Sequence, residues 1–246
     1  MMRWKCTCAY DGREYAGWQK QNGQISVQQV VEEVMATFFK EPVGIQGSGR
    51  TDAGVHALEQ VFHFDQDWKH GGEKMVKAFA ALLPKSIQVS SVVEVEDDFH
   101  ARFSAISKRY FYQIKLGDAD PFEDPFCWSI PGPIDFNLLN AALELFVGEK
   151  DFAAFASSRG NGLEYETTVR TIQEAKLRQD SSFIRLSFQA DGFMYKMVRS
   201  LVGTAVNVGA GRLSLEQLEK VFETKQRIPL VQAAPAKGLF LEKVFY

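Results

Sequence analysis

One short segment concentrates the residue types that could do chemistry. It reads GSGRTDAGVHA over residues 47–57, with Asp52 two residues after Arg50 and four residues before His56. In extended backbone, Arg50 and Asp52 point the same way. Because glycine has no Cβ, the glycines of this segment let another chain or a ligand come close to the backbone. The composition therefore favours a loop that presents a carboxylate to a large partner.

Two other interpretations of the segment compete with this one. A phosphate-binding loop is disfavoured, because the segment lacks the G-x-x-x-x-G-K-[ST] pattern and an acidic residue would repel phosphate. A tight turn capped by Asp52 is the purely structural alternative, since aspartate often caps turns. Thr51 and His56 are expected to hold the loop rather than to react.

Alternating and helical patterns predict the elements that position this loop. Residues 2–10 and 60–65 are typical of strands, and so are 87–95 and 108–116. Ser26 and Gln29 predict a capping box, which opens a helix whose apolar residues recur at helical spacing. A second helix is predicted over residues 73–83. The loop therefore lies between the first helix and the second predicted strand.

The second half of the chain repeats this mixture of elements after a proline-rich stretch. Its predicted elements are helices at 135–146, 193–207 and 214–224 and strands at 170–178, 183–190 and 238–246. We expect an α+β fold of two similar subdomains, with a mixed, largely antiparallel sheet. The expected boundaries are an N-terminal subdomain at 1–115, a proline-rich connection at 116–134 and a C-terminal subdomain at 135–246.

Composition limits the classes of function. The chain has 246 residues and a net charge of −3, which is weak evidence against nucleic-acid binding but leaves local basic clusters possible. The three cysteines are too few for a disulfide framework, and the four histidines are scattered, so no metal site is expected. No apolar run is long enough to span a membrane, and a cytoplasmic protein is expected.

Several long motifs, in order along the chain, resemble the tRNA pseudouridine synthase A family. The loop GRTDAGVHA is similar to the active-site loop of that family. Further similar segments are YDGREYAGWQKQ (10–21), SVQQVVEEV (26–34), DFHARFSAISKRYFYQI (98–114), KMVRSLVGTAVNVGAG (196–211) and AKGLFLEKVFY (236–246). The resemblance covers essentially the whole chain, and several ordered motifs together are far more specific than one loop.

The resemblance implies the pseudouridine synthase fold, with an active-site cleft between the two subdomains. It implies an enzyme that isomerises uridines 38, 39 and 40 in the anticodon stem-loop of tRNA, without cofactor or metal. Asp52 matches the catalytic aspartate, and Tyr110 the tyrosine that stacks on the target base. Arg199 matches the basic partner of the aspartate, and Arg50 the residue that fills the space left by the flipped base. Family members are homodimers that hold tRNA across both subunits.

The resemblance leaves three points open. Tyr195 and Lys196 stand where the family often has two histidines, so a related synthase with another RNA target stays an alternative. A non-catalytic RNA-binding module is another, although Asp52, Tyr110 and Arg199 are all present. An aspartate-dependent hydrolase is a weak third, since it would need a second carboxylate nearby. The candidate RNA-contacting residues are Arg13, Lys20, Arg102, Arg109 and Lys196.

Overall fold

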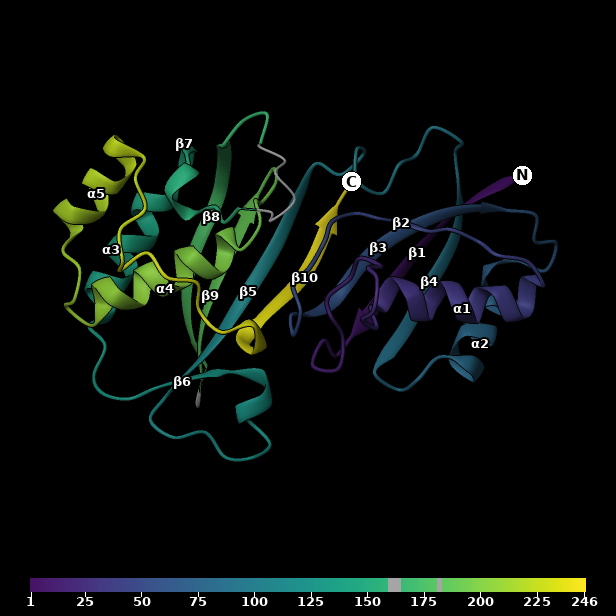
Figure 1. The fold of residues 1–246 in the computed structure, drawn as a ribbon, viewed down its shortest axis with the longest axis horizontal. Helices are drawn as coiled ribbons and strands as arrows, with labels where there is room; N and C mark the ends of the chain where they lie inside the picture. The colour runs from purple at the N-terminus through teal and green to yellow at the C-terminus, as the bar shows by residue number, and fades with distance from the viewer. Residues whose placement is uncertain (159–164, 181–182) are drawn as a thin grey trace. The chain divides into compact units, whose positions relative to one another are not determined.

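The computed structural model describes residues 1–158, 165–180 and 183–246 (Figure 1). By contacts the chain divides into unit 1, Met1–Ile106 with Phe240–Tyr246, and unit 2, Ser107–Leu239. The elements of unit 1 are β1 (Met2–Tyr10), α1 (Val27–Phe39), β2 (Gln46–Gly47), β3 (His56–Gln66), α2 (Gly72–Leu82), β4 (Ile87–Val95) and nearly all of β10 (Leu239–Phe245).

The strands of unit 1 follow the order β4-β1-β3-β10, and the short β2 pairs with β3. β1 is antiparallel to both β3 and β4, whereas β10 runs parallel to β3. Every second residue of β1 is buried, from Trp4 to Tyr10, as alternating side-chain direction requires. The predicted strand at 2–10 is therefore confirmed together with its apolar face.

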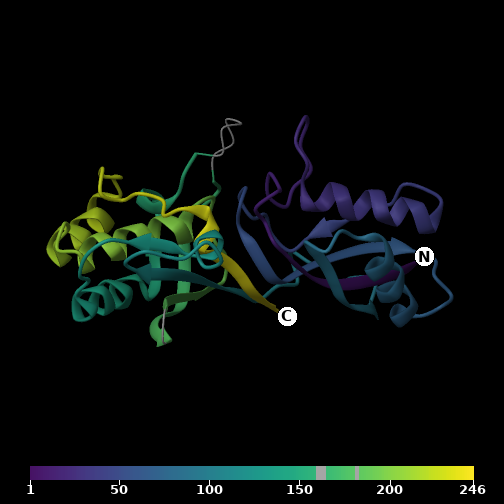
Figure 2. The ribbon, with the colours of Figure 1, turned by 90° about the horizontal axis from the view of Figure 1, so that it is seen from below.

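Two helices bury aromatic side chains against this sheet. Phe39 of α1 packs edge-on against Phe64 of β3, with ring centroids 5.9 Å apart. Phe38 of α1 meets Phe79 of α2 at 5.3 Å and 90°, a geometry that aromatic pairs favour. Figure 2 shows the segment between β1 and α1 rising beside the N-terminal end of α1. Unit 1 thus has a core between its sheet and two helices, with that segment at one end.

Ser26 caps α1 as predicted, because its hydroxyl accepts a hydrogen bond from the Gln29 amide at 3.3 Å. The side-chain amide of Gln29 donates to Glu33 at 2.8 Å. The reciprocal capping box is instead formed at the start of α5, between Ser214 and Gln217. The cap was therefore predicted correctly, while the full two-way motif lies at another helix.

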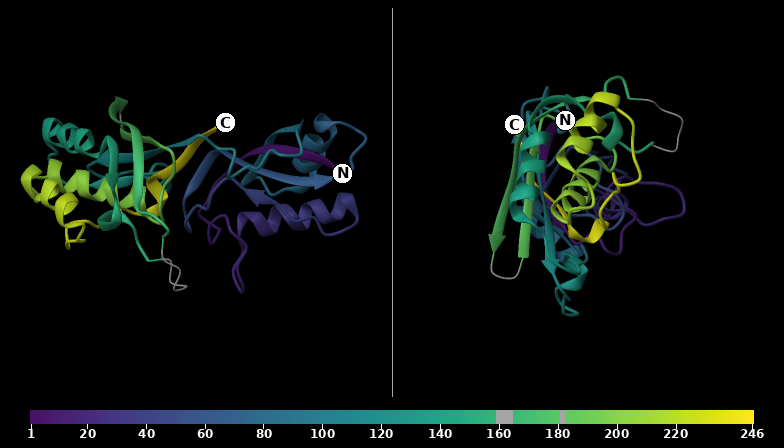
Figure 3. Two further views of the ribbon diagram at one scale, coloured as in Figure 1. Left: turned by 90° about the horizontal axis from the view of Figure 1, so that it is seen from above. Right: turned by 90° about the vertical axis from the view of Figure 1, so that its left-hand side faces the viewer.

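The strands of unit 2 follow the order β5-β9-β8-β7, and β6 pairs parallel with β5. Figure 3 shows, in its right-hand view, α4 and α5 on one side of these strands. The elements of unit 2 are β5 (Ser107–Leu116), η1 (Asp124–Phe126), β6 (Trp128–Ile130), α3 (Phe136–Phe146), β7 (Gly148–Asp151), η2 (Ala153–Phe155), β8 (Val169–Asp180), β9 (Phe183–Ala190), α4 (Met197–Gly209), α5 (Leu215–Thr224) and η3 (Ala236–Gly238).

The expected α+β class with a mixed, largely antiparallel sheet is confirmed. The division by contacts differs from the expected boundaries at 115 and 135. β5 belongs to unit 2, the stretch 116–134 carries β6 paired to β5, and β10 returns to unit 1. No helix within the described ranges combines the length and apolar character that crossing a membrane requires.

Candidate active site

The loop that carries Asp52 is the tip of a hairpin in unit 1. β2 and β3 are antiparallel, with Gln46 opposite His63 and Gly47 opposite Phe62. The amide of Ser48 extends the ladder by donating to the carbonyl of Val61 at 2.7 Å. The chain then leaves the sheet and returns at His56, where β3 begins. A rigid pair of strands therefore holds both ends of the loop.

A tight turn lies at the C-terminal side of this loop. The amide of Val55 donates to the main-chain carbonyl of Asp52 at 3.1 Å. Gly54, the third residue of this turn, has φ of 76°, which a side chain would strain and glycine accepts. The structure therefore contains the tight turn that the sequence suggested. The hydrogen bond that closes this turn uses the main-chain carbonyl of Asp52. A turn and a presented carboxylate are compatible in this loop.

The segment after β1 packs closely against the loop. The amide of Trp18 donates to the carbonyl of Thr51 at 3.2 Å. A Cβ at Gly17 would lie 2.4 Å from that same carbonyl, and one at Gly47 would lie 2.3 Å from the Trp18 indole nitrogen. Gly47 was expected to admit another chain or a ligand, but it accommodates the protein's own tryptophan. Glycine is needed here so that two loops can touch.

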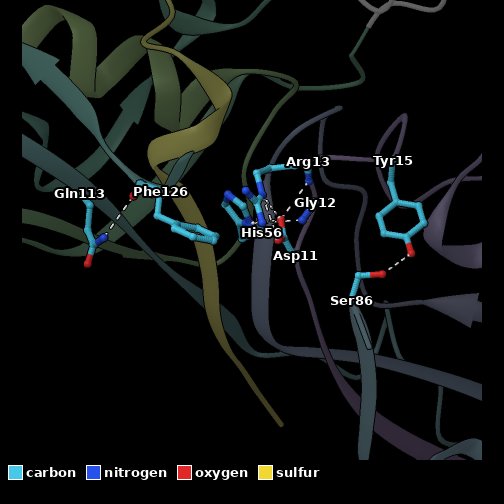
Figure 4. Close-up of polar contacts among 8 residues, drawn as sticks. All are labelled: Asp11, Gly12, Arg13, Tyr15, His56, Ser86, Gln113 and Phe126. Carbon is cyan, nitrogen blue, oxygen red and sulfur yellow. Dashed lines mark hydrogen bonds and ion pairs between the residues drawn. The ribbon is translucent and has the colours of Figure 1, made fainter. Parts of the chain in front are cut away.

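His56 fixes the start of β3 to the end of β1 (Figure 4). It is only 2% exposed, and its Nδ1 accepts a hydrogen bond from the Gly12 amide at 3.1 Å. Its ring stacks on Phe240 of β10, with centroids 4.6 Å apart and planes at 19°. These contacts agree with the predicted holding role of His56.

Asp11 lies beside His56 and is tied to Arg13. Its Oδ1 is 3.3 Å from Nδ1 of His56, and Arg13 donates to both carboxylate oxygens at 2.6–3.0 Å. Burial by itself would raise the pKa of Asp11, but the hydrogen bonds and charge of Arg13 lower it below its ordinary value. Arg13 is thus engaged in an ion pair within unit 1.

Arg50 lies two residues before Asp52 and is exposed. Its Nε donates to the side-chain carbonyl of Gln19 at 3.0 Å. Gln19 belongs to the segment after β1, so Arg50 links the hairpin loop to that segment at the surface. Asp52 itself is half-buried.

The other two predicted site residues belong to unit 2. Tyr110 of β5 is 7% exposed and meets Phe193 edge-on, with centroids 5.2 Å apart. Arg199 lies in the first turn of α4 and donates from Nε to the carbonyl of Ala234 at 2.7 Å, while its own carbonyl accepts from the Ala234 amide at 2.9 Å. Both side chains are therefore held by contacts within unit 2.

The start of α4 differs from the predicted helix at 193–207. The helix begins at Met197, because Lys196 adopts a left-handed conformation with φ of 58° and serves as the N-cap. Its ammonium group lies 5.0 Å from the ring centroid of Tyr195. Tyr195 and Lys196, which were expected to differ from the family pattern, thus lie in contact just before Arg199.

The remaining basic candidates have partners inside the protein. Lys20 pairs with Glu32 at 3.2 Å. Arg109 donates to the Gln189 side chain at 2.7 and 3.1 Å. Arg102 lies over the ring of Phe103 at 5.4 Å. Across the residues that the structure describes, no group of three histidine, cysteine or acidic side chains could hold a metal ion.

Sequence reasoning missed the buried polar side chains behind the loop. Tyr10, Ser48 and Gln60 are all buried and hydrogen-bonded around residues 48–51. Gln60 was the available signal, because it is a polar residue at the first position of the predicted strand 60–65. Its partners are 11 and 12 residues away and, for Tyr10, 50 residues away, so local patterns could not identify them.

A sequence model described as tRNA pseudouridine synthase matches residues 7–104 and 142–246. The chain therefore belongs to the tRNA pseudouridine synthase family, and it is an enzyme of the intramolecular isomerase class. It is 40% identical over 245 residues to tRNA pseudouridine synthase A 1 of Protochlamydia amoebophila, covering 99% of this chain and 96% of that protein. The tRNA pseudouridine synthase A of Lacticaseibacillus casei is 40% identical over 250 residues, with both chains fully covered. That of Geobacillus sp. is 38% identical, with 99% and 98% covered.

Proposed function

We propose that this enzyme converts uridine to pseudouridine at positions 38, 39 and 40 of the anticodon stem-loop of tRNA. Membership of the family supports the reaction class, and the full-length similarity to proteins named tRNA pseudouridine synthase A supports tRNA as the substrate. The observation that carries the proposal is the GRTDAGVHA loop, held as a hairpin tip with Asp52 at its centre.

Asp52 is the proposed catalytic residue. In the reaction the bond between N1 of uracil and C1′ of the ribose breaks, the base rotates, and a bond forms between C5 and C1′. The hydrogen on C5 then leaves as a proton and N1 takes up a proton, so the product is an isomer of the substrate. The Asp52 carboxylate can attack C6 of the base or C1′ of the sugar, or it can remove a proton to give a glycal. Each route needs the carboxylate ionised.

Three further side chains have proposed roles toward the same nucleotide. Arg199 takes the role of the basic partner that the family pattern pairs with the aspartate. Tyr110 stacks on the target base. Arg50 occupies the space that the flipped base leaves, because a paired base must leave the helix to be reached, at a cost of a few kcal/mol. No cofactor or metal is assigned to any step.

Action at three neighbouring positions requires recognition of shape and backbone rather than sequence. The chain carries a net charge of −3, so local basic groups have to neutralise the phosphates. We infer a homodimer, in which basic groups of two subunits face one tRNA. A single species of 27.7 kDa, the mass of one chain, in light scattering of the purified enzyme would contradict this part of the proposal.

Direct mapping tests the substrate positions. Unmodified tRNA transcripts with uridine at 38, 39 or 40 are incubated with the enzyme, and pseudouridine is located by chemical labelling and primer extension. The expected result is modification at each of these three positions, and at no other position of the same transcripts. Uridines outside the anticodon stem-loop serve as the internal control.

One observation favours a second candidate, a synthase for another RNA site. Tyr195 is 39% exposed, Lys196 lies over its ring, and this feature replaces the family's usual histidines just before Arg199. Modification confined to other positions, or to a different RNA, would support this candidate and contradict the proposed specificity.

A further inference from the structure

A buried network of polar side chains lies directly behind residues 48–51. Its centre is Gln60 of β3, whose exposed fraction is 0%. The side-chain carbonyl of Gln60 accepts from the Ser48 hydroxyl at 2.7 Å and from the Val61 amide at 3.1 Å. Its side-chain amide donates to the carbonyl of Gly49 at 3.1 Å. One strand residue therefore binds two successive residues of the loop.

Tyr10, the last residue of β1, contacts the next part of the loop. Its hydroxyl is 2.9 Å from the hydroxyl of Thr51, and both residues are buried. The side-chain amide of Gln60 reaches the same Tyr10 oxygen through a long contact of 3.5 Å. In the contact between Tyr10 and Thr51, either hydroxyl can be the donor. The network thus runs along the loop from Ser48 to the residue before Asp52.

The burial of these groups makes their geometry specific. Buried polar atoms that lose a partner are costly, because water cannot replace the lost hydrogen bond. The side-chain amide and carbonyl of Gln60 and the hydroxyls of Tyr10 and Thr51 are therefore satisfied together in one arrangement of the loop. On the other side of Thr51, the Trp18 amide binds its carbonyl at 3.2 Å. Thr51 is held from its side chain and its main chain at once.

We propose that Tyr10 and Gln60 are positioning residues, which orient Asp52 by fixing the backbone of Ser48–Thr51 from behind. This inference rests on the proposed function, because it assigns them a role toward the Asp52 carboxylate. Both side chains are buried, so they act through the loop and not on the substrate. A misplacement of about 1 Å at a reacting group lowers a rate by about 100-fold. Loss of the network therefore slows the chemical step more than it weakens tRNA binding.

Tyr10→Phe is the variant that tests this inference, since it removes only one hydroxyl. Tyr15→Phe is a matched control: the Tyr15 hydroxyl binds the Ser86 hydroxyl at 2.7 Å, in the same unit but outside the network (Figure 4). Single-turnover tritium release from C5-labelled tRNA, the Kd for tRNA and the melting temperature are measured for both. We expect Tyr10→Phe to lower the single-turnover rate about 10-fold or more, with the Kd changed less than 2-fold and both variants melting alike.

Thr51 variants identify the bond responsible. Thr51→Val removes the hydroxyl, and Thr51→Ser keeps it. We expect Thr51→Val to slow turnover as Tyr10→Phe does, Thr51→Ser to restore most of the rate, and the double variant Tyr10→Phe with Thr51→Val to be no slower than either alone, because both break one interaction.

Three results would overturn the inference. The first is an unchanged rate for Tyr10→Phe in an active enzyme. The second is an equal loss in the Tyr15→Phe control. The third is independent, multiplying effects of Tyr10→Phe and Thr51→Val. A wild-type enzyme that binds tRNA but releases no tritium overturns the proposed function itself. The wild-type measurement therefore distinguishes a failure of the proposed function from a failure of the positioning role.

Discussion

At the scale of single residues, His63 shows how burial sets a protonation state. It is 5% exposed, and its Nδ1 accepts a hydrogen bond from the Ala101 amide at 3.1 Å. That bond requires an unprotonated Nδ1. Burial, then the neighbouring His100 and the charge of Arg3, lower the pKa of His63 from 6.5 to about 4. The folded protein therefore favours the neutral form of this histidine.

Stability is predicted to fall in acid because of His63. Its folded pKa lies below its unfolded value, so its contribution is complete above pH 6.5 and is lost as the pH falls toward 4. The full shift corresponds to about 3 kcal/mol. Urea unfolding of wild type and His63→Asn at pH 7 and pH 4.5 measures this. Asparagine keeps an acceptor near Ala101 but cannot be protonated.

We expect the wild type to lose more free energy of unfolding than His63→Asn over this pH interval. Acidic groups titrate in both proteins, so the difference between the two curves isolates the histidine. Parallel curves would show that His63 is not the group whose protonation destabilises the fold.

At the scale of elements, local patterns predicted those strands and helices whose own residues determine them. The strands 2–10 and 87–95 have the predicted bounds, because strict alternation or a β-branched run marks them. β3 begins at His56, four residues before its predicted start, because Ala57 pairs with Tyr10 and His56 pairs with Phe240. Pairing between strands that are distant in the chain leaves no pattern in the local sequence.

Two further differences have similar causes. The short strands β2 and β6 were not predicted, since two or three residues cannot show a period and their pairing partners are distant in sequence. α4 begins four residues later than predicted because Lys196 takes a left-handed conformation. Glycine adopts that conformation most readily, so a lysine in the sequence does not indicate it. The Asp52 loop was recognisable as a motif, whereas Tyr10 and Gln60 behind it depend on contacts between separate strands.

The cap of α5 gives a prediction at this scale. The Ser214 hydroxyl accepts from the Gln217 amide at 3.2 Å, and the Gln217 side chain accepts from the Ser214 amide at 2.9 Å. Ser214→Ala is expected to lower the free energy of unfolding by about 1 kcal/mol, because it leaves a helix amide without this acceptor. Urea unfolding measures the change. Glu219→Ala, an exposed change in the same helix, should stay within about 0.5 kcal/mol, and equal losses in both variants would contradict the role of the cap.

At the scale of the whole molecule, the binding of tRNA and the isomerisation reaction depend on different groups. A chain with a net charge of −3 has to bind a polyanion, and many of its basic side chains already pair within their own unit, as Arg13 does with Asp11 and Lys20 with Glu32. To bind RNA, such basic groups have to exchange their internal carboxylate partners for phosphates. We therefore expect the affinity for tRNA to depend on the salt concentration. The proposed chemistry, by contrast, rests on one carboxylate, that of Asp52, in a loop held by the sheet of unit 1.

The most direct test of the account is tritium release from tRNA labelled at C5 of uridine, with wild type and Asp52→Ala side by side. Formation of the bond between C5 and C1′ must expel that hydrogen. We predict release by the wild type and less than about one-thousandth of that rate from Asp52→Ala, with tRNA affinity and melting temperature nearly unchanged, because loop carboxylates rarely carry stability. Release by Asp52→Ala at the wild-type rate, or loss of activity only through a much lower melting temperature, would contradict the catalytic role of Asp52.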